Sequence, residues 1–151
     1  TCDGETYIYT KGYVDLNKLK QLIAGVEGVE RIYSGAEAVK LGADPKCSFL
    51  VEAKPGYYFT DEVNRPAIVE KVDPSSLGTH DRYRAVHGYG PNQPNYFTTA
   101  IFVGPSINQG KEVETAHLVD EGPTFAKILG LHYPAPTAGQ VIPGVIKSEV
   151  K

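Results

Sequence analysis

Residues 87–131 read HGYGPNQPNYFTTAIFVGPSINQGKEVETAHLVDEGPTFAKILGL, and this stretch decides the fold of the chain. It begins with a histidine in a turn rich in glycine and proline. The apolar run from Thr98 to Val103 then predicts a buried strand, which a Gly-Pro pair ends. A polar loop leads to Asp120, and a short helix, EGPTFAKILG, is expected to follow it and to end at Gly130. This order places a polar turn at the mouth of an apolar strand, with a capped helix behind it.

Residues 1–60 predict alternating strands and helices. Strands are expected at residues 5–10, 29–33, 48–54 and 57–60, with helices after Asp15 and after Ser34. Ser34 and Glu37 have the spacing of a capping box. The first two strands are expected to pair in parallel through a crossover, and the last two to form a hairpin. The fold class is thus α/β, or α+β: a small mixed β-sheet with helices on one face, similar to a ferredoxin-like or split β-α-β layer.

Residues 61–98 show little hydrophobic periodicity and predict a long loop, in which only 67–72 favour a brief strand. Such a loop is uncommon in a compact domain and is typically functional or disordered, so we interpret it as a segment near an active site. The tail is rich in proline, and its apolar patch at 141–146 is expected to dock on the body. Two parts are expected: a layer at 1–60, and a loop with a strand and a helix at 61–151.

The sequence resembles the C-terminal part of the type I phosphodiesterase/nucleotide pyrophosphatase family of the alkaline phosphatase superfamily. In that family an HGY turn carries a zinc-binding histidine, a strand ending in GP or GxG follows, and a D-x-x-P-T-x-A-x-x-L-G helix lies near the chain end. The matching residues here are His87-Gly88-Tyr89, 101–105 and 120–130. The phrases GVERIYS, GAEAVKLGADP and EAKPGYYF are similar to the family's ferredoxin-like insertion. The resemblance therefore implies an insertion or cap layer at 1–60 and the end of a phosphatase-like α/β core at 61–151.

The resemblance implies a parent protein that hydrolyses phosphate esters or nucleotides with two divalent metal ions of the zinc type. It implies that His87 is a ligand of one ion. The family's nucleophile, its Asp-His pair and its D-x-x-x-H motif have no counterpart here, so no catalytic residue and no substrate-binding residue is assigned. All 151 residues match only about the last third of a family member. We therefore expect a piece of a longer protein that is inactive by itself and holds no ion tightly.

The residues alone leave the role of each histidine open. A neutral imidazole is a common zinc ligand, and a glycine such as Gly88 lets the backbone approach an ion closely. A single histidine in a turn is also an ordinary surface group. His80, between Thr79 and Asp81, is the rival candidate. His117 and His132 favour structural roles, the latter because it follows the end of a helix.

Several other polar residues have two interpretations. Asp120 fits a metal ligand but fits a helix N-cap better. Arg82 and Arg84 can hold a phosphate or stay solvated. The tyrosines in or near loops can stack on a base or line a sheet edge; these are Tyr57, Tyr58, Tyr83, Tyr89, Tyr96 and Tyr133. Cys2 and Cys47 fit either a disulfide or two free thiols, and the second interpretation is the simpler one.

Composition and charge limit the kinds of partner that the chain can bind. A net charge of −3 gives no basic footprint for nucleic acid. No apolar run reaches the roughly 18 residues of a membrane span, and the first ten residues lack the pattern of a signal peptide. A strand at 98–103 without neighbours would leave apolar edges exposed, so self-association through it or through 141–146 is expected. The alternative function is a stand-alone ferredoxin-like module that binds a small ligand or a protein.

Overall fold

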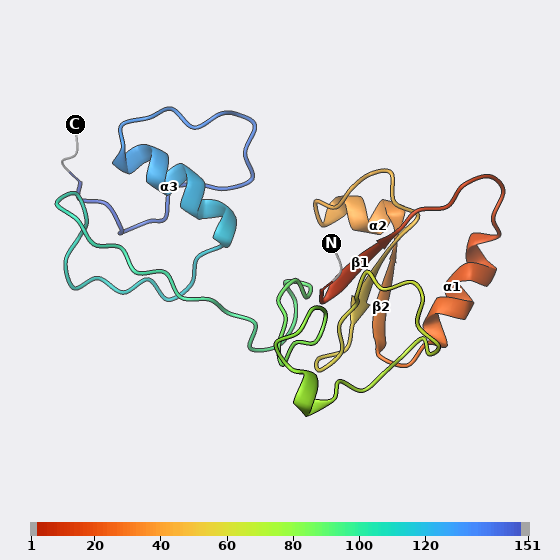
Figure 1. Cartoon of the computed structure of the whole chain (residues 1–151). Coiled ribbons are helices and arrows are strands. Elements are labelled where there is room, and N and C mark those ends of the chain that lie inside the picture. Colours follow the sequence, from red (N-terminus) through yellow and green to blue (C-terminus); the bar gives the residue numbers. More distant parts are fainter. Residues whose placement is uncertain (1–2, 149–151) are drawn as a thin grey trace. The chain divides into compact units, whose positions relative to one another are not determined.

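The computed structural model describes residues 3–148 and divides into two compact units, Thr1–Tyr96 and Phe97–Lys151 (Figure 1). The boundary expected after residue 60 falls inside the first unit. That unit contains the sheet and the long loop after it, and the second contains one α-helix and the tail. Each unit has its own buried apolar cluster, so each is described by itself.

The first unit is built on a sheet of three strands, β1 (Glu5–Ile8), β2 (Val29–Ser34) and β3 (Phe49–Ala53). The strand order is β1-β3-β2, and β3 pairs antiparallel with both neighbours. The α+β class is confirmed, but the expected parallel bonding of the first two strands is wrong, and the sheet is antiparallel rather than mixed. β3, whose residues FLVEA are all buried, takes the central place and separates β1 from β2.

The expected strand at 57–60 does not form. The Tyr57 amide closes a turn onto the Lys54 carbonyl at 2.9 Å, and the Phe59 amide bonds the Asp3 carbonyl at 2.8 Å. These bonds carry the chain past the start of β1, so no hairpin forms with β3. In the rest of the loop up to Tyr96 the regular structure is a 3-10 turn, Pro74–Ser76, and 67–72 form no strand.

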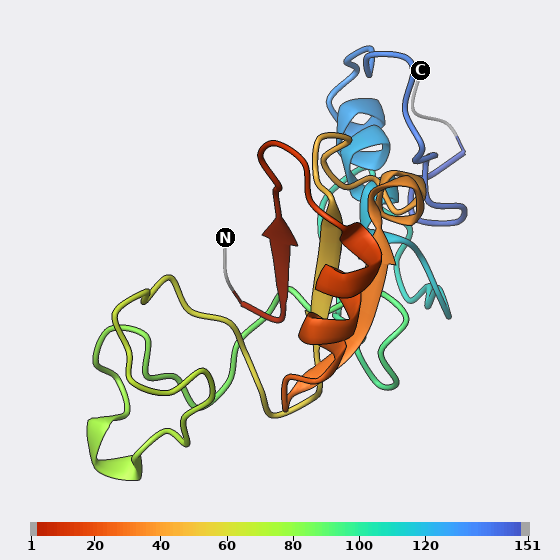
Figure 2. The same cartoon turned by 90° about the vertical axis from the view of Figure 1, so that its right-hand side faces the viewer.

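Helices α1 (Leu16–Ala24) and α2 (Gly35–Lys40) both pack against β2 (Figure 2). Their predicted caps are confirmed. The Asp15 carboxylate accepts the Asn17 and Lys18 amides at 3.0 and 3.1 Å. Ser34 and Glu37 form the capping box, which lowers the pKa of Glu37 because its carboxylate accepts hydrogen bonds from Ser34. Cys47 is a free thiol buried beneath α2, and Cys2 lies outside the described residues.

The second unit contains helix α3 (Glu121–Ile128), which the sequence predicts. A 3-10 turn, Leu118–Asp120, directly precedes it, where the sequence predicts only a polar loop. The predicted strand at 98–103 is wrong. The segment is not paired, and the side chains of Ile101 and Val103 are 84% and 90% exposed, while Phe102 packs against the ring of Phe125. A strand needs a partner strand to satisfy its backbone groups, and the described part of this unit offers none.

The tail docks on the second unit as expected. Ile142 and Val145 are buried with Ile107, and Ile107 forms an isolated β-bridge with Ile146. The Asn108 side chain donates to the Gly144 and Ile146 carbonyls, which fixes the same corner. The apolar patch of the tail is therefore covered by its own unit.

Asp120 and Thr124 explain why the helix motif needs these residue types. The Asp120 carboxylate does not cap α3, contrary to expectation; it accepts the His117 amide at 3.1 Å and the Gln140 amide at 2.9 Å. These two amides lower the pKa of Asp120, that of Gln140 having the larger effect. The buried Thr124 hydroxyl donates to the Asp120 carbonyl at 2.7 Å and accepts the Ile142 amide at 2.9 Å. The motif thus ties the tail to the helix.

None of the helices in the described range 3–148 is both long and apolar enough to cross a membrane.

Candidate metal-binding turn

The His87 turn is fixed to the rest of the first unit through its backbone. The His87 carbonyl accepts the Gly4 amide at 3.0 Å, and the Gly88 amide donates to the Tyr96 hydroxyl at 3.0 Å. Gly88 has a φ of +80°, a conformation that residues with a side chain rarely adopt. The two bonds involve the peptide that follows His87 and hold the backbone of the turn at this point.

The second half of the turn is held from two further elements. The Tyr89 hydroxyl donates to the Tyr57 carbonyl at 2.6 Å. The Gly90 amide donates to Glu52 Oε1 at 3.0 Å, and the Gln93 side chain donates to the same oxygen at 2.8 Å. Glu52 belongs to the central strand, so the turn is bonded directly to the middle of the sheet.

Two glycines make this close approach possible. A Cβ on Gly4 would lie 2.6 Å from the Tyr89 ring, and a Cβ on Gly90 would lie 2.7 Å from Glu52 Oε1. Both distances are well below van der Waals contact. A larger residue at Gly4 would push the turn away from β1, and one at Gly90 would displace the turn or the Glu52 carboxylate.

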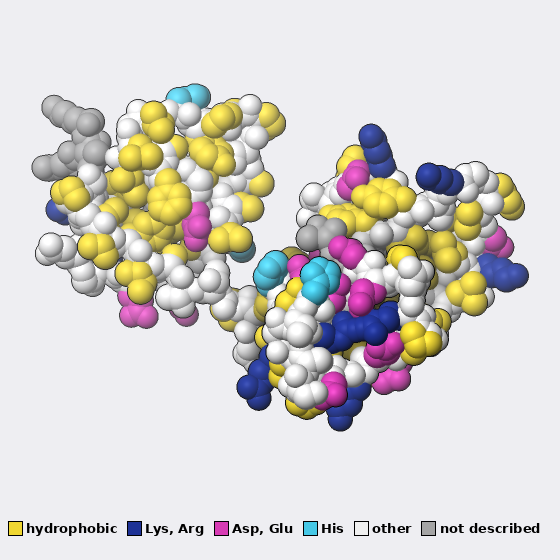
Figure 3. All heavy atoms as spheres, viewed as in Figure 1, with side chains coloured by type: hydrophobic (Ala, Val, Ile, Leu, Met, Phe, Trp, Pro, Cys, Tyr) yellow, Lys and Arg dark blue, Asp and Glu magenta, His cyan; other side chains and the backbone are white. Residues whose placement is uncertain are grey.

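The imidazole of His87 projects from this fixed turn into solvent. Its side chain is 88% exposed, and Nδ1 lies 3.8 Å from Oδ2 of Asp3. Figure 3 shows histidine and acidic side chains beside one another on the surface of the first unit. No group of three or more His, Cys, Asp or Glu side chains that could hold an ion occurs within residues 3–148. His87 and Asp3 therefore fit part of a zinc ligand set and not a complete one.

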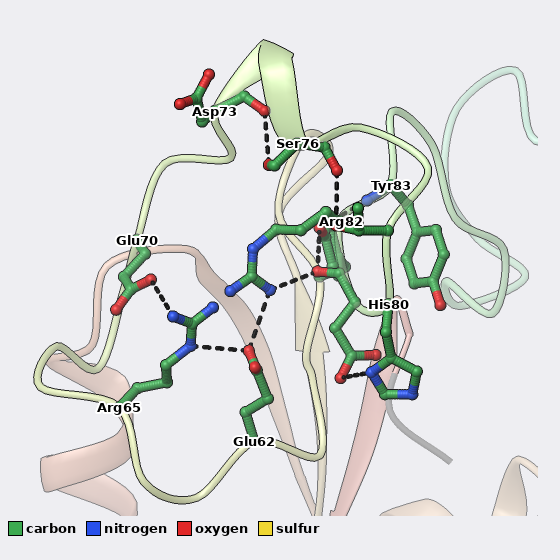
Figure 4. Close-up of polar contacts among 11 residues, drawn as sticks. Glu62, Arg65, Glu70, Asp73, Ser76, His80, Arg82 and Tyr83 are labelled. Atoms are coloured by element: carbon green, nitrogen blue, oxygen red, sulfur yellow. Dashed lines mark hydrogen bonds and ion pairs between the residues drawn. The ribbon is translucent and has the colours of Figure 1, made fainter.

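The rival, His80, lies in a separate contact. Its Nδ1 is 2.9 Å from Oδ2 of Asp81, and its side chain is 87% exposed (Figure 4). Asp81 has a positive φ of 57°, and its carbonyl accepts the Tyr58 hydroxyl and an Arg82 Nη1 hydrogen. Asp81 thus contacts Nδ1 of His80, and Nε2 of the same ring faces water. Both histidines are thus accessible, but only His87 belongs to a turn bonded to the sheet.

Two arginines of the loop, Arg65 and Arg82, are engaged in ion pairs (Figure 4). Glu62 Oε2 accepts Arg82 Nη1 at 3.0 Å and Arg65 Nε at 2.9 Å, and Arg65 also lies 3.7 Å from Glu70. The hydrogen bond to Glu62 raises the pKa of Arg65. Arg82 thus uses one of its N–H groups to bond Glu62. Arg84, in the same loop, is exposed. These ion pairs connect distant parts of the loop. A phosphate would have to compete with Glu62 for the guanidinium of Arg82.

The loop and the edge of the sheet line an open cavity of about 1140 Å³. Five of the tyrosines noted in the sequence line it: Tyr57, Tyr58, Tyr83, Tyr89 and Tyr96. Their rings also contact one another, with centroids 6.0 Å apart in the Tyr58–Tyr83 pair and in the Tyr89–Tyr96 pair. The cavity is large enough for a small ligand, and its walls offer aromatic faces and hydroxyl groups.

The second unit contains two of the histidines noted in the sequence, His117 and His132. The backbone amide of His117 bonds Asp120 at the start of α3, and His132 is exposed beyond the end of that helix. Tyr133 packs against Gly122, where a Cβ would lie 2.6 Å from its hydroxyl. Up to residue 148, these contacts bring no His, Cys, Asp or Glu side chains of the second unit together in a group of three or more.

Sequence reasoning missed Asp3 and Glu52. Asp3 lies 84 positions before His87 in the chain (87 − 3), so no local pattern joins them. Glu52 carried a usable signal: it is the one charged residue inside the buried strand FLVEA, and such a residue needs a polar partner from another segment.

No protein-family model, no curated protein and no solved structure matches this chain. The resemblance described above therefore rests on the residues of the HGY turn, the GP-ended run and the α3 motif.

Proposed function

We propose that this chain is the C-terminal segment of a metal-dependent phosphodiesterase/nucleotide pyrophosphatase, and that His87 is a ligand of one of its two ions. The observation that carries the proposal is an exposed imidazole on a turn bonded at Gly4, Tyr96, Tyr57 and Glu52. A turn fixed in this way lowers the entropy lost when the imidazole binds an ion.

Asp3 supplies the second donor of the proposed half-site. Its carboxylate lies 3.8 Å from the His87 ring and is 25% exposed, so an ion could draw both groups together. Zinc sites in proteins use at least three protein ligands. The missing ligands, and the nucleophile, would come from the part of the parent that precedes this segment. When bound, the ions would polarise the phosphoryl oxygen and stabilise the leaving oxygen of a phosphate ester.

The unpaired segment at 97–103 supports the same proposal. Phe97, Ile101 and Val103 are between 84% and 90% exposed, although the run TTAIFV has the composition of an interior strand. Exposed apolar runs of this kind mark an interaction surface. In the proposed parent this segment would contact the part of the chain that precedes it.

The alternative function is a binding module without catalysis, with a ferredoxin-like layer as its scaffold. The cavity of about 1140 Å³ lined by tyrosines favours it. Such a module would bind a small aromatic or polar ligand through the loop and would need no ion. The two functions therefore differ in whether His87 must bind an ion.

Titration of the 151-residue chain with zinc tests the proposal, with the imidazole resonances followed by NMR. A complete structural zinc site supplies about 10–16 kcal/mol, so a half-site with two donors should bind with micromolar or weaker affinity. We expect the His87 resonances to shift first and the His87→Ala variant to lose this binding. His132, exposed in the other unit, is the internal control. Equal responses of His87, His80 and His132, or unchanged binding in His87→Ala, would contradict the proposal.

A further inference from the structure

We propose that Glu52 is the positioning residue for His87: a buried carboxylate of the central strand that holds the turn in the orientation His87 needs. This inference rests on the proposed function for the role of His87. It rests on the structure for the link between Glu52 and the turn.

The burial of Glu52 calls for an explanation. The residue is 0% exposed in the middle of β3, where its register neighbours are Glu5 on β1 and Arg31 on β2. A buried carboxylate is costly, and apolar residues of similar volume often replace such a group without loss of stability. Burial and the neighbouring charge of Glu52 raise the pKa of Glu5, so the position also disturbs its neighbour. Stability of the sheet alone does not favour a glutamate here.

The partners of its two oxygens show what the glutamate does. Oε2 faces the sheet: it accepts the Tyr33 hydroxyl at 3.2 Å and lies 3.8 Å from Arg31 Nη1. Oε1 faces the turn: it accepts the Gly90 amide at 3.0 Å and the Gln93 side chain at 2.8 Å. One carboxylate therefore joins β2 and β3 to a turn about 40 residues further along the chain.

Only a short piece of backbone separates His87 from the residue that Glu52 binds. Gly90 follows His87 by three residues, and the two residues between them are bonded to Tyr96 and Tyr57. A Cβ on Gly90 would lie 2.7 Å from Oε1, so a side chain there would displace either the Glu52 carboxylate or the turn. The position of the Glu52 carboxylate thus sets the distance between the turn and the sheet.

Three variants of the 151-residue chain test the inference against a matched control. Glu52→Gln keeps an acceptor for the Gly90 amide, and Glu52→Ala removes it. Gln93→Ala removes one donor without touching the sheet. The control is Val51→Ala, because Val51 is 1% exposed on the same strand but points to the opposite face.

Two readouts separate positioning from stability. The first is the amide exchange of Gly90 relative to that of Ala53, the last residue of β3, whose amide bonds the Gly4 carbonyl at 2.8 Å just before β1. The second is the zinc-induced shift of the His87 imidazole. In Glu52→Ala we expect Gly90 to exchange about tenfold to a hundredfold faster relative to Ala53, because a hydrogen bond to a charged group is lost. We expect a weaker response of His87 to zinc in the same variant.

The remaining variants give defined outcomes. Glu52→Gln should restore both readouts to within about threefold of the unmodified chain, and Val51→Ala should raise exchange at Gly90 and Ala53 by the same factor. If Glu52→Ala does not fold, Gln93→Ala should still speed exchange at Gly90 relative to Ala53. The inference is overturned if Gly90 follows Ala53 in every variant that folds. If zinc does not shift the His87 imidazole resonances in the unmodified chain, the proposed function is refuted. The exchange data would still decide the link between Glu52 and the turn.

Discussion

Replacement of Thr124 by valine tests how the helix motif holds the tail. Thr124 is fully buried in α3, and its hydroxyl accepts the Ile142 amide at 2.9 Å. Valine has the same shape but no hydroxyl, so the buried Ile142 amide would lose its partner. An unsatisfied buried donor costs about 1–3 kcal/mol, and we expect the second unit to lose about 2 kcal/mol of stability.

The matched variant is Thr124→Ser, which keeps the hydroxyl and deletes one buried methyl group at a cost of about 1 kcal/mol. The assay is urea unfolding followed by NMR resonances of the second unit, because the two units need not unfold together. Exchange of the Ile142 amide, measured on the same samples, should speed up about tenfold or more in Thr124→Val and stay near its original rate in Thr124→Ser. If the valine variant is as stable as the original chain, with Ile142 still protected, the hydroxyl does not hold the tail and the motif needs another explanation.

Three further predictions concern acid, self-association and activity. The amides of Gln140 and His117 lower the pKa of Asp120 in the folded state, so its contribution to stability is present at neutral pH and is lost as the pH falls through that lowered pKa, below about 4. Unfolding midpoints of the second unit between pH 7 and pH 3 should show this loss, and Asp120→Asn should flatten it; a parallel pH profile of the variant would contradict the assignment. The chain should self-associate at high concentration through 98–103, and Ile101→Lys should weaken this, because Ile101 is 84% exposed; light scattering that shows a monomer at all concentrations would refute it. The isolated chain should not hydrolyse p-nitrophenyl phosphate esters with added zinc, and turnover that disappears in His87→Ala would show that the chain is catalytically complete.

Structure that depends on neighbouring residues was predictable from the sequence. Asp15, the Ser34–Glu37 pair and α3 were identified because a cap or an amphipathic helix is encoded within a few residues. The coarse class followed from the order of these elements. The α3 motif was identified too, but the role of Asp120 was not, because its partner Gln140 lies 20 residues away.

Structure that depends on distant partners was not predictable. β3 lies between β1 and β2 because three strands compete for the same partners. The lengths of the connections would also have permitted direct pairing of β1 with β2. The run 98–103 has the composition of a strand, but a strand also needs a neighbour, which the second unit does not supply in its described residues. The His87 turn was identified by its composition, whereas its supports, Gly4 and Glu52, come from segments far away in the sequence.

Hydrolysis by the proposed parent protein tests the central claim most directly. The measurement is kcat/KM for bis(p-nitrophenyl) phosphate, together with the zinc content per chain, in the original protein, in His87→Ala and in the control His132→Ala. We predict that His87→Ala lowers kcat/KM by more than about a hundredfold and loses about one ion per chain, because even residues that only support a metal ligand cost 10–100-fold when they are replaced. His132→Ala should match the original protein. Full activity and full zinc content in His87→Ala would contradict the account.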